Sequence, residues 1–188
     1  MILTFFDTET TGFANSNGRI MQFAATVVKL HKDFPPRTVM EFSTLVKGDV
    51  APNVHAQAVH GIDLAETSQG ITDTALCRWF TGVIDKTDIL IAHNLKFDLQ
   101  YMKETYDRLK LPMPGIKRTL CTMEITTPIC RIPKARGAGH KWPKLEEAYR
   151  HLLGKPLDGA HDALVDTRAC RDILLALLKD GKVTLNIA

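Results

Sequence analysis

The sequence has no long hydrophobic run and no secretion signal, and both absences exclude a class of protein. No stretch approaches the about 20 uninterrupted apolar residues of a membrane-spanning helix. The apolar run at residues 2–6 is too short for the core of a signal peptide, and no basic segment precedes it. We therefore expect a cytoplasmic protein that does not associate with membranes.

Cysteine and net charge are also scarce. The four cysteines are spaced widely and irregularly, which is not the pattern of a disulfide framework, so we expect a reducing compartment and mostly buried thiols. A net charge of +3 falls short of the basic surface that would by itself indicate nucleic-acid binding. The apolar fraction of 45% is too high for a disordered chain. At this length we expect one globular domain, residues 1–188.

The order of apolar patterns predicts the fold class. Three β-rich segments with short polar connections predict an antiparallel meander, and helical spacing then alternates with short apolar runs. The result is an α/β fold whose mixed sheet combines the three-strand meander with two parallel strands and carries helices on both faces. The expected strands are 2–6, 19–30, 38–46, 88–92 and 117–120, and the expected helices are 72–84, 96–109, 144–153 and 162–179.

Residues 125–145 break this pattern. They contain three prolines, two glycines, five basic residues and no acidic residue, which predicts a basic loop. Such a loop either binds phosphate, if it lies beside a nucleic-acid site, or is a solvated surface. Trp142 within it would either stack on a base or pack against the last helices. The residues that would contact phosphate are Arg131, Lys134, Arg136 and Lys141.

Four acidic residues stand where acids are unusual. Asp7 and Glu9 are two apart at the end of an extended strand, so their side chains point the same way. Asp98 and Asp166 each lie on the apolar stripe of a predicted helix, with no lysine or arginine at matching positions. A buried carboxylate needs a cation, a donor or a proton. Four acids that converge on a sheet edge predict a two-metal Mg²⁺ site for phosphoryl transfer.

A histidine accompanies the last of these acids. His161 lies five residues before Asp166, so a loop would hold it above the carboxylates. An ordinary pKa of about 6.5 suits a general base at neutral pH. The same spacing occurs at His93 and Asp98, so spacing alone does not identify the base. His93 stands at a strand end, and we expect it to be a hydrogen-bonded structural residue.

Three ordered motifs carry more weight than any single acid. They are Asp-x-Glu-Thr-Thr-Gly at 7–12, His-Asn-x-x-Phe-Asp at 93–98 and Ala-His-Asp-Ala-x-x-Asp at 160–166. On these motifs the chain resembles the DEDDh branch of the 3′→5′ exonucleases, typified by the proofreading epsilon subunit of bacterial replicative polymerases. The resemblance implies a ribonuclease H-like fold and two Mg²⁺ or Mn²⁺ ions. Its residues would be Asp7, Glu9, Asp98 and Asp166 as metal ligands and His161 as general base.

The resemblance also implies contacts to the terminal nucleotide. Thr10, Gly12 and Phe13 would contact it, with phenylalanine in place of the leucine that is common in the family. Asn94, in the second motif, is a further expected substrate contact. His60, which begins a His-Gly-Ile segment similar to a short family motif, would either pack its loop or contact the substrate.

The resulting hypothesis is a metal-dependent 3′→5′ exonuclease that releases nucleoside monophosphates from single-stranded or frayed DNA. The alternatives are an RNA-end trimmer on the same scaffold and a non-catalytic or proofreading module docked on a polymerase. A polymerase partner has little support, because the bacterial subunit carries a docking tail and only residues 181–188 follow the last helix here. A zinc site from Cys121, Cys130 and His140 is disfavoured, because a fourth ligand and tight C-x-x-C pairing are missing.

Overall fold

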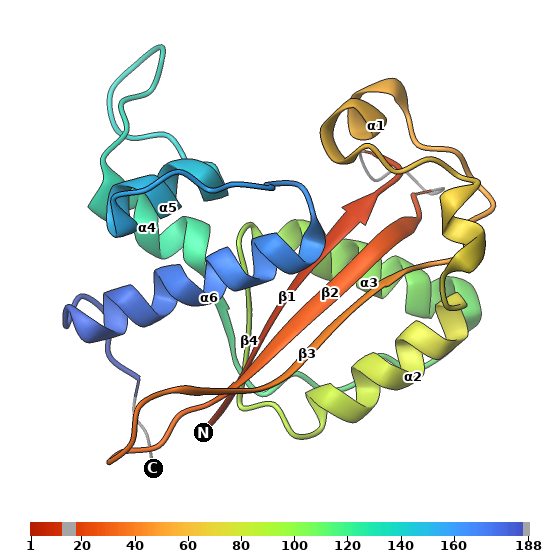
Figure 1. Cartoon of the computed structure of the whole chain (residues 1–188), viewed down its shortest axis with the longest axis horizontal. Coiled ribbons are helices and arrows are strands. Elements are labelled where there is room, and N and C mark those ends of the chain that lie inside the picture. Colours follow the sequence, from red (N-terminus) through yellow and green to blue (C-terminus); the bar gives the residue numbers. More distant parts are fainter. Residues whose placement is uncertain (13–17, 186–188) are drawn as a thin grey trace.

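A five-stranded mixed sheet forms the centre of the molecule (Figure 1). The computed structural model describes residues 1–12 and 18–185. The strands are β1 (Ile2–Thr10), β2 (Ile20–Lys29), β3 (Arg37–Leu45), β4 (Ile89–Ala92) and β5 (Thr119–Cys121), in the spatial order β3-β2-β1-β4-β5. β1, β2 and β3 form an antiparallel meander, β4 is parallel to β1, and β5 is parallel to β4. The expected α/β fold with a mixed sheet is confirmed.

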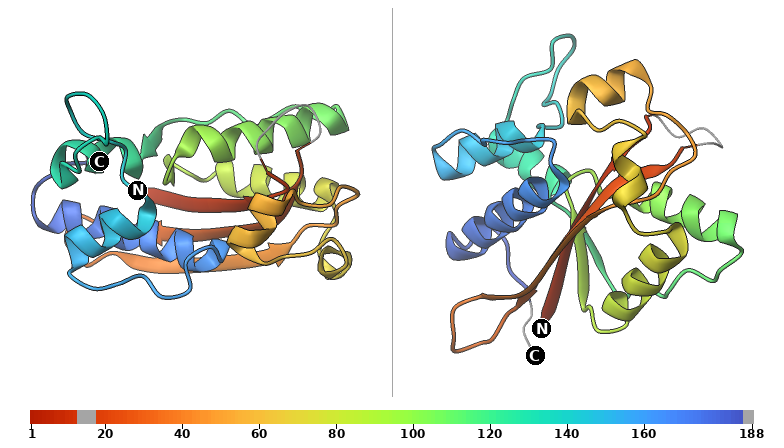
Figure 2. Two further views of the ribbon diagram at one scale, coloured as in Figure 1. Left: turned by 90° about the horizontal axis from the view of Figure 1, so that it is seen from above. Right: turned by 45° about the vertical axis from the view of Figure 1, so that its right-hand side comes forward.

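Helices cover both faces of this sheet (Figure 2). They are α1 (Val54–His60), α2 (Asp73–Ile84), α3 (Leu95–Leu109), α4 (Thr122–Cys130), α5 (Leu145–Leu153) and α6 (Ala163–Lys179), with a short 3₁₀ helix, η1, at Glu66–Gln69. On the α2 and α3 face, the rings of Phe6, Phe23 and Phe80 pack against one another. On the opposite face, Leu3 and Phe5 belong to a buried cluster with apolar residues of α6. Both faces of β1 are therefore buried.

β1 extends further than its apolar residues indicated. The strand continues past Phe6 to Thr10, with Asp7 opposite Ala24 and Glu9 opposite Gln22 on β2, so both acids lie at the end of the strand, as expected. Because side chains alternate along a strand, Asp7 and Glu9 face α6 with Phe5, whereas Thr8 faces α3. The acidic end of β1 thus lies inside the sheet, between two layers of helices.

Two α-helices, and the 3₁₀ helix η1, were not expected from the pattern. α1 has no buried residue and is defined by its caps: Asn53 Oδ1 accepts from the Ala56 N–H, and Gly61 ends the helix in the left-handed conformation. α4 replaces the first part of the expected loop 125–145, although Pro128 lies inside it. That part of the loop prediction is wrong, because burial of α4 against α5 and α6 outweighs its poor helix propensity.

The rest of the loop folds back on itself as a hairpin. The Lys141 N–H donates to the Ile132 carbonyl oxygen at 2.8 Å, and the Lys134 N–H donates to the Gly139 carbonyl oxygen at 3.3 Å. We call residues 131–141 the basic hairpin. It projects from the α4 and α5 side of the molecule, at the same edge as α1 (Figures 1 and 2).

All four cysteines are buried and free, as expected. Within residues 1–12 and 18–185, no helix has the length and apolar character needed to cross a membrane.

Candidate active site

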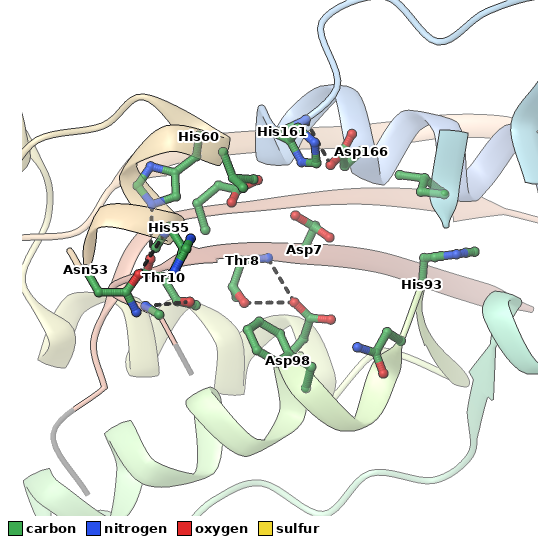
Figure 3. A pocket seen from close by; sticks show the side chains of 17 residues that line it. Asp7, Thr8, Thr10, Asn53, His55, His60, His93, Asp98, His161 and Asp166 are labelled. Atoms are coloured by element: carbon green, nitrogen blue, oxygen red, sulfur yellow. Dashed lines mark hydrogen bonds between the residues drawn. The ribbon is translucent and has the colours of Figure 1, made fainter. Parts of the chain in front are cut away.

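Four carboxylates converge where the carboxyl ends of the parallel strands β1 and β4 meet (Figure 3). Asp7 and Glu9 come from β1, Asp166 comes from the first turn of α6, and Asp98 comes from the first turn of α3. Asp7 lies between Asp98 on one side and Asp166 on the other. The structure therefore brings together the four acids that the sequence singled out, from both layers of helices.

Asp98 is held by the strand residue between the two β1 acids. Its side chain is 2% exposed, and its Oδ1 accepts from the Thr8 N–H at 3.0 Å and from the Thr8 hydroxyl at 2.8 Å. These two bonds fix the carboxylate at the edge of the cleft. Thr8 had no role in the sequence analysis, and the strand alternation that turns it toward α3 is the signal that could have identified it.

Asp166 is only partly satisfied by its surroundings. Its Oδ2 accepts from the backbone N–H of His161 at 3.2 Å. Its Oδ1 is buried and has no hydrogen-bond partner among the residues that the structure describes. Buried carboxylate oxygens are rarely left without a partner in native proteins, so this atom indicates a missing cation or donor.

A glutamine on β2 fixes the N-terminus of α6. Gln22 Nε2 donates to Asp162 Oδ2 at 2.9 Å, and Gln22 Oε1 accepts from the Ala163 N–H at 3.1 Å. Asp162 in turn caps α6, as expected, by accepting from two N–H groups of its first turn. Gln22 pairs with Glu9 across the β1–β2 ladder, so one residue connects the strand acids to the helix that carries Asp166.

The cluster raises the pKa values of all four carboxyls. Burial is the largest cause in each case, and the neighbouring carboxylates add to it. The pKa of Asp7 is raised well above its ordinary value, that of Glu9 rises to about 8, that of Asp98 to about 7 and that of Asp166 to about 6. No lysine or arginine is among the described residues that line this cleft. The arrangement suits a divalent cation, which would offset the repulsion.

His161 stands beside two of the acids. It is exposed, its backbone is left-handed with φ 72°, and its ring offers an atom within 4.8 Å of carboxylate oxygens of Glu9 and Asp166. Asp166 fixes this loop conformation by accepting the His161 N–H. The imidazole is therefore open to solvent while it faces the carboxylates.

His93 and His60 each have both ring nitrogens in hydrogen bonds within the protein. His93 Nε2 donates to the Pro143 carbonyl oxygen and Nδ1 faces the Thr122 hydroxyl, both at 3.0 Å, which agrees with the expected structural role. His60 Nε2 donates to the Thr10 carbonyl oxygen at 3.1 Å, and its Nδ1 accepts from the Ile62 N–H at 3.0 Å. Burial lowers the pKa of both rings. His60 thus fastens the end of α1 to the end of β1.

The carboxylates open into a cleft of about 390 Å³. Among the expected substrate contacts, Thr10, Gly12, His60 and Asn94 line it. Phe13 lies outside the described residues. The hairpin residues Arg131, Lys134 and Arg136 are exposed but do not line the cleft. Lining residues that the sequence analysis did not identify include Asn53, His55, Val59, Phe97 and Leu145.

Position 12 has room only for glycine because the side chain of Asn53 packs against it. Its φ is 124°, and a Cβ atom at this position would overlap the side-chain amide of Asn53. The Asn53 N–H also donates to the Thr11 carbonyl oxygen at 2.8 Å. The segment after β1 and the start of α1 are therefore packed together, and they form one wall of the cleft (Figure 3).

Cys121, Cys130 and His140 do not make a group with metal-ligand spacing among the residues that the structure describes. Cys121 and Cys130 are buried, whereas His140 is exposed on the basic hairpin. Within the described part of the chain, the one side-chain group with metal-ligand spacing is that of Glu9, His161 and Asp166.

Comparison with known families now identifies the fold. Residues 4–174 match the RNase_T family, described as exonuclease. The chain belongs to this exonuclease family. The resemblance inferred from the three motifs is thereby confirmed, and the fold around the carboxylates is that of a nuclease.

Relatives of this chain include much longer proteins. It is 27% identical, over 184 residues, to the PolC-type DNA polymerase III of Streptococcus pyogenes serotype M2, covering 94% of this chain and 11% of the polymerase. The same enzyme from serotype M1 matches to the same extent. This chain therefore spans about one-ninth of the curated relatives that it matches.

Solved structures share the fold at lower identity. E. coli exonuclease I in complex with a dA16 oligonucleotide superposes with a TM-score of 0.76 at 18% identity, covering 95% of this chain and 41% of that chain. Exonuclease X in complex with 5′ overhanging duplex DNA superposes with a TM-score of 0.67 at 21% identity, covering 97% and 94%. The ribonuclease H-like architecture expected from the motifs is confirmed.

Proposed function

We propose that this chain is a metal-dependent exonuclease that removes nucleoside monophosphates from the 3′ end of DNA, acting on single strands or frayed ends. In this proposal residues 1–188 act as one exonuclease domain. The observation that carries the proposal is the convergence of Asp7, Glu9, Asp98 and Asp166, with one buried Asp166 oxygen that has no hydrogen-bond partner among the described residues. The scissile phosphodiester could not enter among four ionised carboxylates unless cations separated the charges. Two Mg²⁺ or Mn²⁺ ions, held by these four residues, fit the donor set.

Residues of this chain would orient the metal ligands and accept the proton of the attacking water. Bound divalent ions of this kind activate water and stabilise the leaving oxygen. Thr8 fixes Asp98, and the His161 backbone fixes Asp166, so the ligands are oriented before the substrate arrives. The His161 imidazole, exposed and beside Glu9, would take the proton of the attacking water and pass it to solvent.

The cleft walls would hold the terminal nucleotide. Thr10, Gly12 and Asn94 line the cleft beside the acids, and we propose that they contact the sugar and phosphate, with Phe13 next to them in sequence. His60 would hold the Thr10 backbone in place and would not contact the substrate itself, because both of its ring nitrogens are already bonded. We propose that Arg131, Lys134 and Arg136 bind phosphates further along the strand, outside the cleft.

DNA is favoured over RNA by the relatives. The matched polymerase is a DNA polymerase, and the two solved structures described above, of exonuclease I and exonuclease X, are complexes with DNA. No described residue of the cleft is assigned to a 2′-hydroxyl, so the comparison of the two nucleic acids belongs in the test.

The test is digestion of matched DNA and RNA oligomers, each labelled once at the 5′ end and once at the 3′ end, with Mg²⁺ or with EDTA. We expect Mg²⁺-dependent digestion of DNA, a ladder from the 5′ label and immediate release of labelled mononucleotide from the 3′ label. Asp7→Ala should abolish digestion but keep the circular dichroism spectrum of the wild type. Asp107→Ala, which removes an exposed acid paired with Lys103 on α3, is the matched control and should retain activity.

Three results would reject parts of the proposal. Digestion that persists in EDTA, or in Asp7→Ala at the wild-type rate, would remove the metal cluster from the mechanism. Faster digestion of RNA would make the chain an RNA-end trimmer. Absence of digestion with intact folding would favour a docking module.

A further inference from the structure

Trp142 is an exposed aromatic side chain beside the cleft. It follows the basic hairpin directly, and 67% of it is accessible to solvent. Packing against the last helices, one of the two roles that the sequence left open, is therefore wrong. A tryptophan this exposed gains little from the fold, since the burial that normally stabilises such a side chain is missing.

The backbone next to Trp142 is fixed to the cleft wall. The carbonyl oxygen of Pro143 accepts from His93 Nε2 at 3.0 Å, and His93 itself lines the cleft. Leu145, two residues further on, lines the cleft as well. Consecutive Cα atoms are about 3.8 Å apart, so Trp142 sits on the rim next to an anchored residue. Its position is set by the fold even though its ring is free.

The segment that carries Trp142 has a charge opposite to that of the cleft. Arg131, Lys134 and Arg136 are exposed on the basic hairpin, and no acidic residue occurs between positions 125 and 145. Lys141 is neutralised by Glu147, with its Nζ 2.6 Å from a carboxylate oxygen. Arg131, Lys134 and Arg136 form no ion pair within residues 1–12 and 18–185. An exposed aromatic ring on a basic segment is the combination that binds single-stranded nucleic acids, by stacking and phosphate contacts.

We propose that Trp142 stacks on an unpaired base of the substrate strand, on the 5′ side of the scissile phosphate, where the strand leaves the cleft toward the basic hairpin. This inference rests on the proposed function and specifies its substrate. A paired base cannot present a free face to a tryptophan at a strand's edge, so the contact selects single-stranded DNA. Stacking also tolerates every base, which suits an enzyme that must advance along any sequence.

The experiment compares a long and a minimal substrate. The long substrate is a dT12 oligomer, and the minimal one is the p-nitrophenyl ester of thymidine 5′-phosphate, which has no strand to reach Trp142. Trp142→Ala should raise KM for dT12 by about 5-fold to 150-fold, the cost of removing one base–aromatic stack. It should leave kcat on dT12 and kcat/KM on the ester unchanged. Trp142→Phe should recover most of the affinity.

A matched control and a position scan sharpen the result. Phe34 is exposed to the same degree, 66%, on the β2–β3 connection, and Phe34→Ala should change neither substrate's kinetics. Moving one abasic nucleotide along dT12 should raise KM of the wild type at the stacked position and have no such effect in Trp142→Ala. Binding of labelled dT12 in EDTA, followed by fluorescence anisotropy, should show the same loss of affinity without any catalysis.

The outcomes separate this inference from the proposed function. If the wild type cleaves neither substrate but binds dT12 through Trp142, the stacking site stands and the catalytic proposal fails. If Trp142→Ala binds and cleaves dT12 like the wild type, the stacking site is refuted while the exonuclease activity stands. Equal loss on both substrates would also refute it, because Trp142 would then act on the active site itself.

Discussion

Two histidines each precede an aspartate by five residues, and the fold gives them opposite surroundings. His93 has both ring nitrogens bonded within the protein, whereas His161 is exposed and faces Glu9 and Asp166. A general base must be able to bind a proton and release it to solvent. The surroundings of the rings, and not their spacing, therefore favour His161 for this role.

The two histidines can be compared by the same substitution. We expect His161→Gln to lower kcat by about 10²-fold to 10⁴-fold, the usual range for general-base catalysis. We expect His93→Gln to keep most of kcat, because glutamine can still donate to the Pro143 oxygen. Single-turnover digestion of DNA at saturating enzyme measures both. A larger loss of kcat in His93→Gln would mean that the base was assigned to the wrong histidine.

At the scale of elements, the N-terminus of α6 controls two functional groups at once. His161 precedes the Asp162 cap, Asp166 lies in the first turn, and Gln22 fastens this turn to β2. Gln22→Met keeps the length of the side chain but removes both hydrogen bonds. We expect a lower melting temperature, from the loss of about 1 to 3 kcal/mol, and a lower kcat with KM for dT12 little changed.

The control for this substitution is another glutamine. Gln100→Met removes a side-chain bond to Glu104 on the exposed face of α3 and should change neither kcat nor KM. Thermal unfolding and steady-state digestion of each variant supply the measurements. If Gln22→Met lost stability but kept full kcat, the glutamine would support the fold without positioning the site.

The basic hairpin makes a second prediction at this scale. Changing Arg131, Lys134 and Arg136 together to glutamine should weaken DNA binding and flatten its salt dependence. The slope of log K against log salt is negative, and on a single strand each lost phosphate contact reduces its magnitude by about 0.7. Catalysis at saturating substrate should survive, because none of the three lines the cleft. Titration of labelled dT12 at several salt concentrations would show an unchanged slope if the hairpin were only a solvated surface.

The sequence predicted the elements that show a clear apolar pattern and missed two helices, α1 and α4, that lack one. β1, α3 and α6 follow hydrophobic periodicity, and their acids could be located because acids interrupt it. α1 buries nothing, so its signals were the Asn53 cap and Gly61 alone. α4 carries Pro128, and its helix depends on packing against α5 and α6 that no local pattern contains.

The residues of the candidate site also divide into those that the sequence predicted and those that it missed. The four acids are visible as polar residues in apolar patterns, whereas Thr8 and Gln22 look like ordinary strand residues. Their roles come from pairing: the strand register sets Gln22 opposite Glu9, and alternation turns Thr8 toward Asp98. A partner that reaches the site from a distant segment requires the three-dimensional fold to be known.

At the scale of the whole molecule, the carboxylate cluster makes stability depend on pH. Unfolded carboxyls titrate near pH 4, whereas those of Asp166, Asp98 and Glu9 have pKa values of about 6, 7 and 8 in the fold. Between about pH 4 and pH 8 the folded state binds more protons than the unfolded state, so the stability of the fold falls as the pH rises. The stabilising contribution is fully present below about pH 4 and is lost as the pH passes through 6 to 8. Without metal, the melting temperature should therefore be lower at pH 8.5 than at pH 5.5.

Metal and one substitution should each relieve the repulsion within the carboxylate cluster. A divalent ion that binds only the folded state stabilises it by about 2.7 kcal/mol at one hundred times its dissociation constant. Asp7→Asn removes the charge that lies between Asp98 and Asp166 while it keeps the shape of the side chain. In EDTA at neutral pH this variant should melt higher than the wild type, because its neighbours repel one another less. In Mg²⁺ it should gain less, because one ligand is weakened.

Thermal unfolding of the wild type, Asp7→Asn and Asp107→Asn, each in EDTA and in Mg²⁺, measures both effects. Asp107 is an exposed acid outside the cleft, so its variant should respond to Mg²⁺ as the wild type does. The two halves of the prediction have one cause, since the charges that repel without metal are the charges that bind it. If Asp7→Asn melted lower than the wild type in EDTA and still gained fully from Mg²⁺, the carboxylates would not form a repelling cluster, and the metal site would have to lie elsewhere.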